Sequence, residues 1–201
     1  MAGGLVLVTG GARSGKSALA ERLAARLGGA VLYVATAEAG DAEMADRIRR
    51  HRERRPPSWR TLEAPRAVVA ALAAAPPADV VLLDCLSLWV SNLLLERVPW
   101  EGEIPPAEAS AAAAAVEAGV RGLLAWGRSS GAWLIVVSNE VGSGIVPAAP
   151  LARLYRDVLG AANQAIAAEA DRVYYCVAGR VLDLSGAPAV DAFEPPLPEE
   201  P

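Results

Sequence analysis

The only lysine of the chain lies in a motif that wraps the phosphates of a nucleotide. Residues 10–17 read Gly-Gly-Ala-Arg-Ser-Gly-Lys-Ser, which fits the pattern G-x-x-x-x-G-K-[ST]. Of the 19 basic residues, 18 are arginine. A compact ammonium at Lys16 can lie against the β- and γ-phosphates inside a tight ring of backbone amides, where a planar guanidinium is too large. The motif therefore predicts a nucleoside triphosphate site formed by Gly10, Gly11, Ala12, Arg13, Ser14, Gly15, Lys16 and Ser17.

A hydroxyl and a carboxylate are placed to hold the Mg²⁺ that accompanies such a nucleotide. Ser17 ends the motif and supplies the hydroxyl. Asp84 directly follows the apolar run 80–83, and a carboxylate at the carboxyl end of a neighbouring buried strand is the partner that the motif requires. The alternative role for Asp84 is to cap a helix that begins at Cys85. Its pairing with the phosphate motif favours the metal ligand.

The single histidine, His51, lies within a strongly basic segment. Residues 47–55 hold six arginines in nine positions. Such a run is typical of a solvated helix end, but Met44, Ile48 and His51 recur at helical spacing, so the imidazole shares an apolar, inward face. The arginines largely lack neighbouring acids, so a triphosphate would serve as their counter-ion. We therefore expect His51 to attack a nucleotide's α-phosphate while arginines stabilise the departing pyrophosphate; a histidine filling a gap between helix and sheet is the alternative.

The charge of the His51 ring depends on its neighbours. Surrounding guanidinium groups disfavour the imidazolium form, whereas the negative end of its own helix favours it. The guanidinium groups should outweigh the helix terminus if several lie within ~6 Å of the ring. We thus expect a neutral, nucleophilic imidazole at about pH 7.

A second glycine-containing loop follows the apolar run 133–137. Residues 139–147 read Asn-Glu-Val-Gly-Ser-Gly-Ile-Val-Pro. Ligands bind at this edge of open α/β sheets, and glycines allow close backbone approach. Glu140 is a candidate to bind a hydroxyl or a base, and a simple connecting loop is the alternative.

Apolar runs and helical patterns alternate along the chain and predict the elements that position these residues. We expect strands over 5–9, 30–35, 59–62, 80–84, 133–137 and 172–177, the last being the final core strand. We expect helices over 17–27, 41–55, 66–75, 85–98, 106–128 and 151–170. In the first helix, Leu19, Leu23 and Leu27 form the apolar face. The alternation indicates an α/β, P-loop NTPase (RecA-like) fold with a mostly parallel sheet and helices on both faces.

Composition indicates a single nucleotide-binding domain over 1–185 and a flexible tail over 186–201, which is rich in proline and acid. With 53% apolar residues in a chain of 201, a substantial core is expected. The net charge of −4 gives no general attraction to nucleic acid or anionic membranes. No uncharged stretch approaches the ~18 residues of a membrane span, and the first residues lack the basic region of a signal peptide. We expect a cytoplasmic protein in which Cys85 and Cys176 are buried, reduced thiols.

Several segments together resemble the bifunctional adenosylcobinamide kinase/adenosylcobinamide-phosphate guanylyltransferase family. The resemblance runs from about Leu5 to Val177, nearly the whole domain, and is far more specific than the phosphate motif alone. Beyond Leu184 the acidic tail departs from the shorter family pattern. The similar segments are 7–17, 33–37, 43–51, 55–63, 138–147 and 151–164.

The resemblance implies two reactions on one scaffold. The hydroxyl of the aminopropanol arm of cobinamide takes the γ-phosphoryl group of ATP or GTP. A histidine then accepts GMP from GTP, releases pyrophosphate and passes GMP to cobinamide phosphate. The guanylylated histidine falls on His51, because no other histidine exists; some relatives carry two adjacent histidines, but Arg50 precedes it here.

The resemblance also implies a homotrimer with the site near a subunit boundary. The nucleotide contacts that it implies are residues 10–17, Ala35, Thr36, Ala37, Arg52, Glu53, Arg54, Arg55, Glu63 and Asp84. Two other functions stay open from the residues themselves: a single-activity kinase of a small molecule in which His51 is structural, and a nucleotide-binding switch module.

Overall fold

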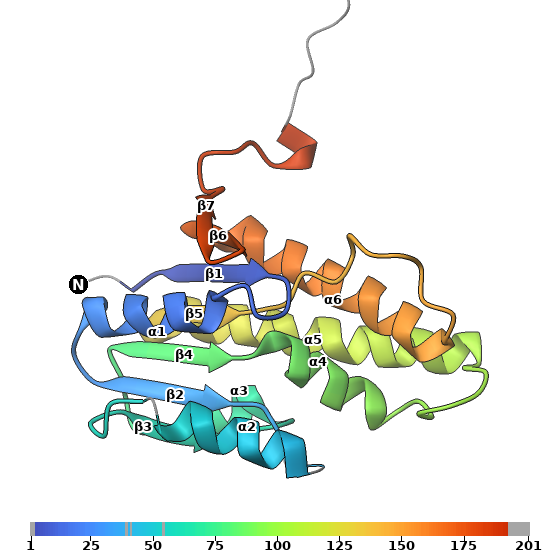
Figure 1. The fold of residues 1–201 in the computed structure, drawn as a ribbon, viewed down its shortest axis with the longest axis horizontal. Coiled ribbons are helices and arrows are strands. Elements are labelled where there is room, and N and C mark those ends of the chain that lie inside the picture. The colour runs from blue at the N-terminus through green and yellow to red at the C-terminus, as the bar shows by residue number, and fades with distance from the viewer. Residues whose placement is uncertain (1–2, 39, 41, 54, 193–201) are drawn as a thin grey trace, which may run out of the picture.

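A seven-stranded sheet organises the chain, with strands in the order β3-β2-β4-β5-β1-β6-β7 (Figure 1). The structure is a computed structural model that describes residues 3–38, 40, 42–53 and 55–192. The strands are β1 (Leu5–Gly10), β2 (Val31–Ala35), β3 (Arg60–Glu63), β4 (Val80–Asp84), β5 (Trp133–Val137), β6 (Arg172–Val177) and β7 (Arg180–Asp183). The helices are α1 (Lys16–Leu27), α2 (Ala42–Glu53), α3 (Val68–Ala74), α4 (Leu86–Leu95), α5 (Pro106–Ser130), α6 (Pro150–Glu169) and the short 3-10 helix η1 (Val190–Ala192).

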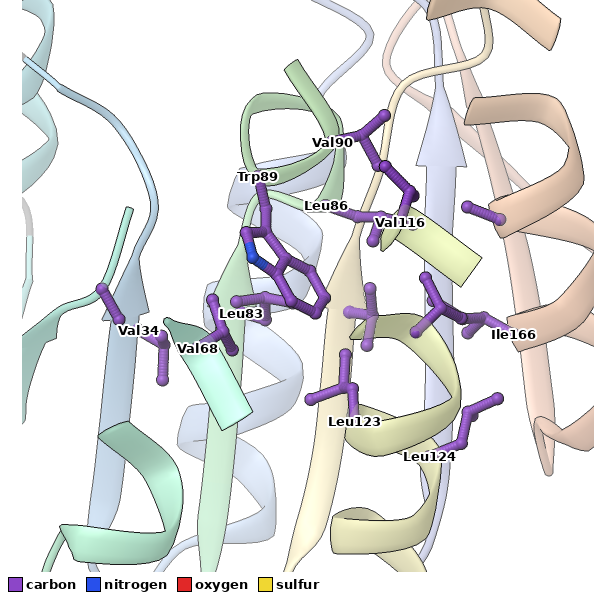
Figure 2. Close-up of a cluster of buried hydrophobic side chains, with 14 of the residues drawn as sticks. Val34, Val68, Leu83, Leu86, Trp89, Val90, Val116, Leu123, Leu124 and Ile166 are labelled. Carbon is purple, nitrogen blue, oxygen red and sulfur yellow. The ribbon is translucent and has the colours of Figure 1, made fainter. Parts of the chain in front are cut away.

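Alternate residues of the central strands face two layers of helices, because successive side chains of a strand point to opposite faces. On one face, Leu83 and Val136 pack against apolar residues of α3, α4, α5 and α6; Figure 2 shows part of this cluster around Trp89. On the other face, Leu82 and Val137 pack with Ala20 and Ala24 of α1. Burial on both faces explains the continuous apolar runs of β4 and β5. The predicted α/β P-loop architecture is confirmed.

The strand β7 is the main departure from the predicted order. It pairs antiparallel with β6, whereas the other neighbouring strands pair in parallel. A two-residue turn at Ala178 and Gly179 joins them, with φ of 49° and 73°, which matches the turn that suits a right-twisted hairpin. The sequence analysis did not predict β7, but all of its residues are exposed, so β6 remains the last strand with a buried side chain among the described residues. The sequence Ala-Gly is a weaker turn signal than Asn-Gly or Asp-Gly, and the exposed side chains of β7 show no strand-like alternation.

Smaller differences concern α1 and the carboxyl-terminal residues. The most deeply buried residues of α1 are Ala20 and Ala24, while the three leucines that we assigned to its inner face are partly buried against the same cluster. Small residues let the helix axis approach the sheet. Residues 193–201 lie outside the described part of the chain, so the flexible tail stays a prediction. Both cysteines are free and buried, as expected. Within the described ranges, no helix is both long and apolar enough to cross a bilayer.

Candidate active site

The phosphate motif forms a loop between β1 and α1 whose shape is set by the backbone. Gly10 and Gly15 have φ of 148° and 98°, values that residues with a side chain rarely adopt. A Cβ atom at Gly10 would also collide with the carbonyl oxygen of Cys176 on β6. The amide of Gly179 donates a hydrogen bond to the carbonyl oxygen of Ser14 at 3.1 Å. Strand β6 and the β6–β7 turn thus brace the loop from outside.

Lys16 and Ser17 begin α1 at the base of this loop. The Nζ of Lys16 donates to the carbonyl oxygen of Gly11 at 3.1 Å, so the ammonium lies across the loop. The first amides of α1 and the positive end of its helix dipole point to the same place. The loop therefore combines the backbone, the cation and the hydroxyl that a triphosphate with Mg²⁺ requires.

Asp84 ends β4 and forms the centre of a small polar cluster. The hydroxyl of Tyr33, on β2, donates to Oδ2 of Asp84 at 2.7 Å. The Nδ1 of His51 lies 3.9 Å from the same oxygen. Burial, followed by the charge of Asp84, raises the pKa of Tyr33, so its hydroxyl remains a donor. The helix α4 begins at Leu86 without a side-chain cap, so the alternative role of Asp84 as a helix cap is not the one observed.

Two cavities meet at His51. The inner cavity, of about 490 Å³, lies between the carboxyl ends of β2 and β4 and the helix α2. Its lining includes Lys16, Ser17, Tyr33, Ala35, Ala37, Glu38, Ile48, His51, Arg52, Arg55, Glu63, Asp84, Cys85 and Asn139. The outer cavity, of about 800 Å³, lies between the phosphate loop and α2, and is lined by residues 12–18 with Asp46, Arg50, His51 and Glu53. His51, Lys16 and Ser17 line both cavities, so the imidazole adjoins the phosphate loop and Asp84 together.

The three arginines of α2 whose side chains are described, Arg49, Arg50 and Arg52, each pair with an acid. Arg49 pairs with Asp46 and Glu53, and Arg50 pairs with Asp46. Arg52 pairs with Glu63 of β3. The expectation that these arginines lack acidic partners is therefore wrong, because acids three and four positions away share a helix face. The Asp84 carboxylate, an anion, lies beside the His51 ring, which the sequence did not predict.

Arg55 differs from the arginines of α2. Its guanidinium carbon lies 3.3 Å from the centroid of the Tyr33 ring, and its Nη1 donates a long, 3.4 Å hydrogen bond to Thr61. Its Nε is buried and has no hydrogen-bond partner among the described residues. Arg54 lies outside the described residues, so its predicted contact stays a prediction.

Thr36 and Glu140 both make hydrogen bonds within the described structure, and the predicted nucleotide contact of Thr36 stays a prediction. The Thr36 hydroxyl, fully buried, donates to the carbonyl oxygen of Cys85 and accepts from its amide, so it joins the ends of β2 and β4. The Glu140 carboxylate accepts from the amides of Gly142 and Ser143. The alternative of a simple connecting loop therefore fits Glu140, whereas Asn139 does line the inner cavity.

Sequence reasoning missed Tyr33 as a functional residue, although it is the one hydroxyl in the apolar run of β2. Cys85 also lines the inner cavity. Burial, followed by the charge of Asp84, raises the pKa of the Cys85 thiol. Because a protonated thiol is a poor nucleophile, the Cys85 thiol is not suited to attack a phosphate.

Comparison with known proteins shows the family of this chain. Residues 6–184 match the family model described as cobinamide kinase / cobinamide phosphate guanyltransferase. The chain belongs to this family. It is 47% identical to the bifunctional adenosylcobalamin biosynthesis protein CobP of Pseudomonas aeruginosa over 195 residues, which cover 90% of this chain and 98% of the relative. It is 43% identical to the bifunctional adenosylcobalamin biosynthesis protein CobU of Escherichia coli and of Salmonella typhimurium, each covering 87% of this chain and 96% of the relative. The resemblance read from the sequence segments is confirmed.

Proposed function

We propose that this chain carries out both reactions of its family. It phosphorylates adenosylcobinamide with ATP or GTP, and it then transfers GMP from GTP through His51 to adenosylcobinamide phosphate. The observation that carries this proposal is the position of His51 on the wall shared by the two cavities. One imidazole there adjoins both the loop that wraps phosphates and the carboxylate of Asp84.

In the phosphorylation step, the loop and Lys16 hold the triphosphate and stabilise the charge that develops on the transferred γ-phosphoryl group. The hydroxyl of cobinamide forms a bond to phosphorus while the bond to the β-phosphate oxygen breaks. Ser17 and Asp84 fit Mg²⁺, because their hard oxygen atoms line one cavity beside Lys16 and Mg²⁺ needs few protein ligands when phosphates and waters supply the others. When bound, Mg²⁺ would neutralise charge on the phosphate oxygens.

In the guanylylation step, a ring nitrogen of His51 attacks the α-phosphorus of GTP. The bond from phosphorus to the bridging oxygen breaks, and pyrophosphate leaves with that electron pair. Asp84 lies on the Nδ1 side of the ring, so its carboxylate stabilises the positive charge that the imidazole gains. Arg52 and Arg55, which line the inner cavity, are proposed to bind the nucleotide together with Glu63. An oxygen of cobinamide phosphate then attacks phosphorus and regenerates His51.

The decisive experiment measures the intact mass of the protein after incubation with GTP and Mg²⁺. We expect the wild type to gain one GMP, through a bond that is labile in acid and stable in base, as a phosphoramidate is. His51→Ala should gain none while it still binds GTP. A single-activity kinase or a nucleotide-binding switch would leave the wild-type mass unchanged, and an undiminished adduct on His51→Ala would refute the covalent role of the ring.

We also propose a homotrimer located in the cytoplasm. The trimer rests on the resemblance to the family, and the location rests on the free cysteines and the biosynthetic role of the relatives. Light scattering on the purified protein should give three times the 20.8 kDa of the chain. A monomeric mass at micromolar concentration would contradict the trimer.

A further inference from the structure

Tyr33 contacts two opposite charges of the inner cavity at once. Its hydroxyl donates to Oδ2 of Asp84 at 2.7 Å, and its ring face carries the guanidinium of Arg55 at 3.3 Å from the centroid. The tyrosine is itself only 2% exposed. It belongs to the apolar cluster between the sheet and α1.

These two charges would neutralise each other if they met. An arginine and an aspartate in one small cavity form a bidentate ion pair when nothing separates them. Among the described residues no ion pair joins Arg55 to Asp84, although both line the same cavity. The ring face of Tyr33 contacts the guanidinium of Arg55, and its hydroxyl contacts the carboxylate of Asp84. The aromatic side chain therefore lies where a direct ion pair would otherwise form.

The contact with Tyr33 also determines which oxygen of Asp84 faces a ligand. The Tyr33 hydroxyl and the Nδ1 of His51 both lie on the Oδ2 side. Among the contacts of the described residues, both reach Oδ2, so Oδ1 is the oxygen that we assign to a cation. Likewise, the Nε of Arg55 is buried without a hydrogen-bond partner among the described residues, which is costly unless a ligand satisfies it. The carboxylate of Asp84 and the guanidinium of Arg55 are thus placed to bind a metal–nucleotide complex.

We propose that Tyr33 is a positioning residue that holds Asp84 and Arg55 apart, so that the carboxylate stays available to the Mg²⁺ ion and the guanidinium to the nucleotide. The proposal rests on the function proposed above. It assigns two separable tasks to one side chain: the hydroxyl orients Asp84, and the ring supports Arg55. A residue with a merely structural role would show no such division.

The test uses two substitutions in the full-length protein. Tyr33→Phe removes the hydroxyl and keeps the ring, and Tyr33→Leu removes both. GTP affinity is measured by equilibrium binding with EDTA and with saturating Mg²⁺, and the Mg²⁺ concentration that half-saturates formation of the GMP adduct is measured separately. Tyr174→Phe is the matched control, because Tyr174 packs against the same apolar cluster from β6.

For Tyr33→Phe we expect the half-saturating Mg²⁺ concentration to rise about tenfold, since a hydrogen bond to a charged group is lost. GTP affinity in EDTA should stay within about twofold, and kcat should fall while KM for GTP does not rise. For Tyr33→Leu we expect GTP affinity in EDTA to fall about fivefold as well, because Arg55 loses its aromatic support. The control should match the wild type in every measurement.

Two outcomes would overturn the inference. One is a Tyr33→Phe protein with the wild-type Mg²⁺ dependence. The other is a Tyr33→Phe protein that loses GTP affinity equally with and without Mg²⁺, which indicates general damage to the fold. If Tyr33→Leu fails to fold, the test compares Asp84→Asn with the double variant Tyr33→Phe/Asp84→Asn. The two should have the same Mg²⁺ dependence, because Tyr33→Phe should have no further effect once Asp84 is neutral. Absence of the GMP adduct on the wild type would instead refute the proposed function.

Discussion

The phosphate loop and the helix α2 face each other across the outer cavity, yet they are held in place by different means. The loop is fixed by its backbone, through two glycines with positive φ and hydrogen bonds to neighbouring strands and turns. The helix α2 has no buried residue among those whose side chains are described. Among the described contacts, the exposed ion pair of Arg52 with Glu63 joins it to β3, whereas the pairs of Arg49 and Arg50 lie within the helix.

This difference suggests a division of labour between the two walls. Exposed ion pairs contribute about 0–1 kcal/mol each, whereas a buried backbone framework is costly to rearrange. We therefore expect α2 to adjust while the loop stays fixed. Two attacks, one on the γ-phosphorus and one on the α-phosphorus, require such an adjustment if a single loop binds the triphosphate in both.

The largest expected effect comes from removing the ammonium group of the phosphate loop. Lys16→Ala should lower kcat of the kinase step about 10²–10³-fold, because a preorganised charge at the transferred group is lost. Arg49→Ala on α2, whose side chain pairs only with helix acids among the described contacts, is the matched control and should keep the wild-type kcat. Steady-state kinetics with ATP and cobinamide measure kcat. An equal loss of kcat in the two proteins would contradict the proposed division of labour between the loop and α2.

A substitution that strains the backbone of the phosphate loop should have a smaller effect. Gly10→Ala should destabilise the fold by about 1–3 kcal/mol, because alanine is strained at this φ and its Cβ meets the carbonyl oxygen of Cys176. Gly11→Ala has open space around its Cβ and should keep the melting temperature. Thermal unfolding of both proteins measures the difference. If Gly10→Ala melts with the wild type, the loop is less rigid than its geometry indicates.

Salt should affect the helix α2 more than the helix α1 that follows the phosphate loop. Raising the salt from 0.1 M to 1 M shortens the Debye length from about 10 Å to about 3 Å, which weakens the exposed ion pairs of α2. Amide hydrogen exchange should become faster in α2 and stay unchanged in α1. Equal protection of both helices across this range would show that packing, rather than charge, holds α2.

The smallest effect concerns the titration of Asp46. The hydrogen bond from Arg49, together with the charge of Arg50, holds the pKa of Asp46 below its usual 3.8. Because the folded pKa is lowered, the contribution of this carboxylate to α2 is present above the unfolded pKa and is lost as the pH falls through the folded value. An NMR titration should place the midpoint below 3.8, and Arg49→Ala should raise it. An unchanged midpoint would show that the pair does not persist in solution.

Most of the fold could be predicted because strand burial and the strand–loop–helix motif are local signals. The positions of Lys16 and Asp84 follow from such signals, since Lys16 lies in the glycine-rich motif that follows the run 5–9 and Asp84 directly follows the apolar run 80–83. The environment of His51 could not be predicted in the same way, because its distance to Asp84 depends on how α2 packs over β2 and β4. The role of Tyr33 is hidden for the same reason: a tyrosine in an apolar run is indistinguishable from a core residue until its hydroxyl is placed.

The link between Gly179 and Ser14 makes the carboxyl-terminal hairpin part of the machinery, although no residue of β7 takes part in the chemistry. A protein trimmed after Val177 would keep every proposed ligand of the nucleotide and lose the brace beneath them. A protein that ends at Val177 should therefore bind a triphosphate less tightly than one that ends at Leu184, where the family match also stops.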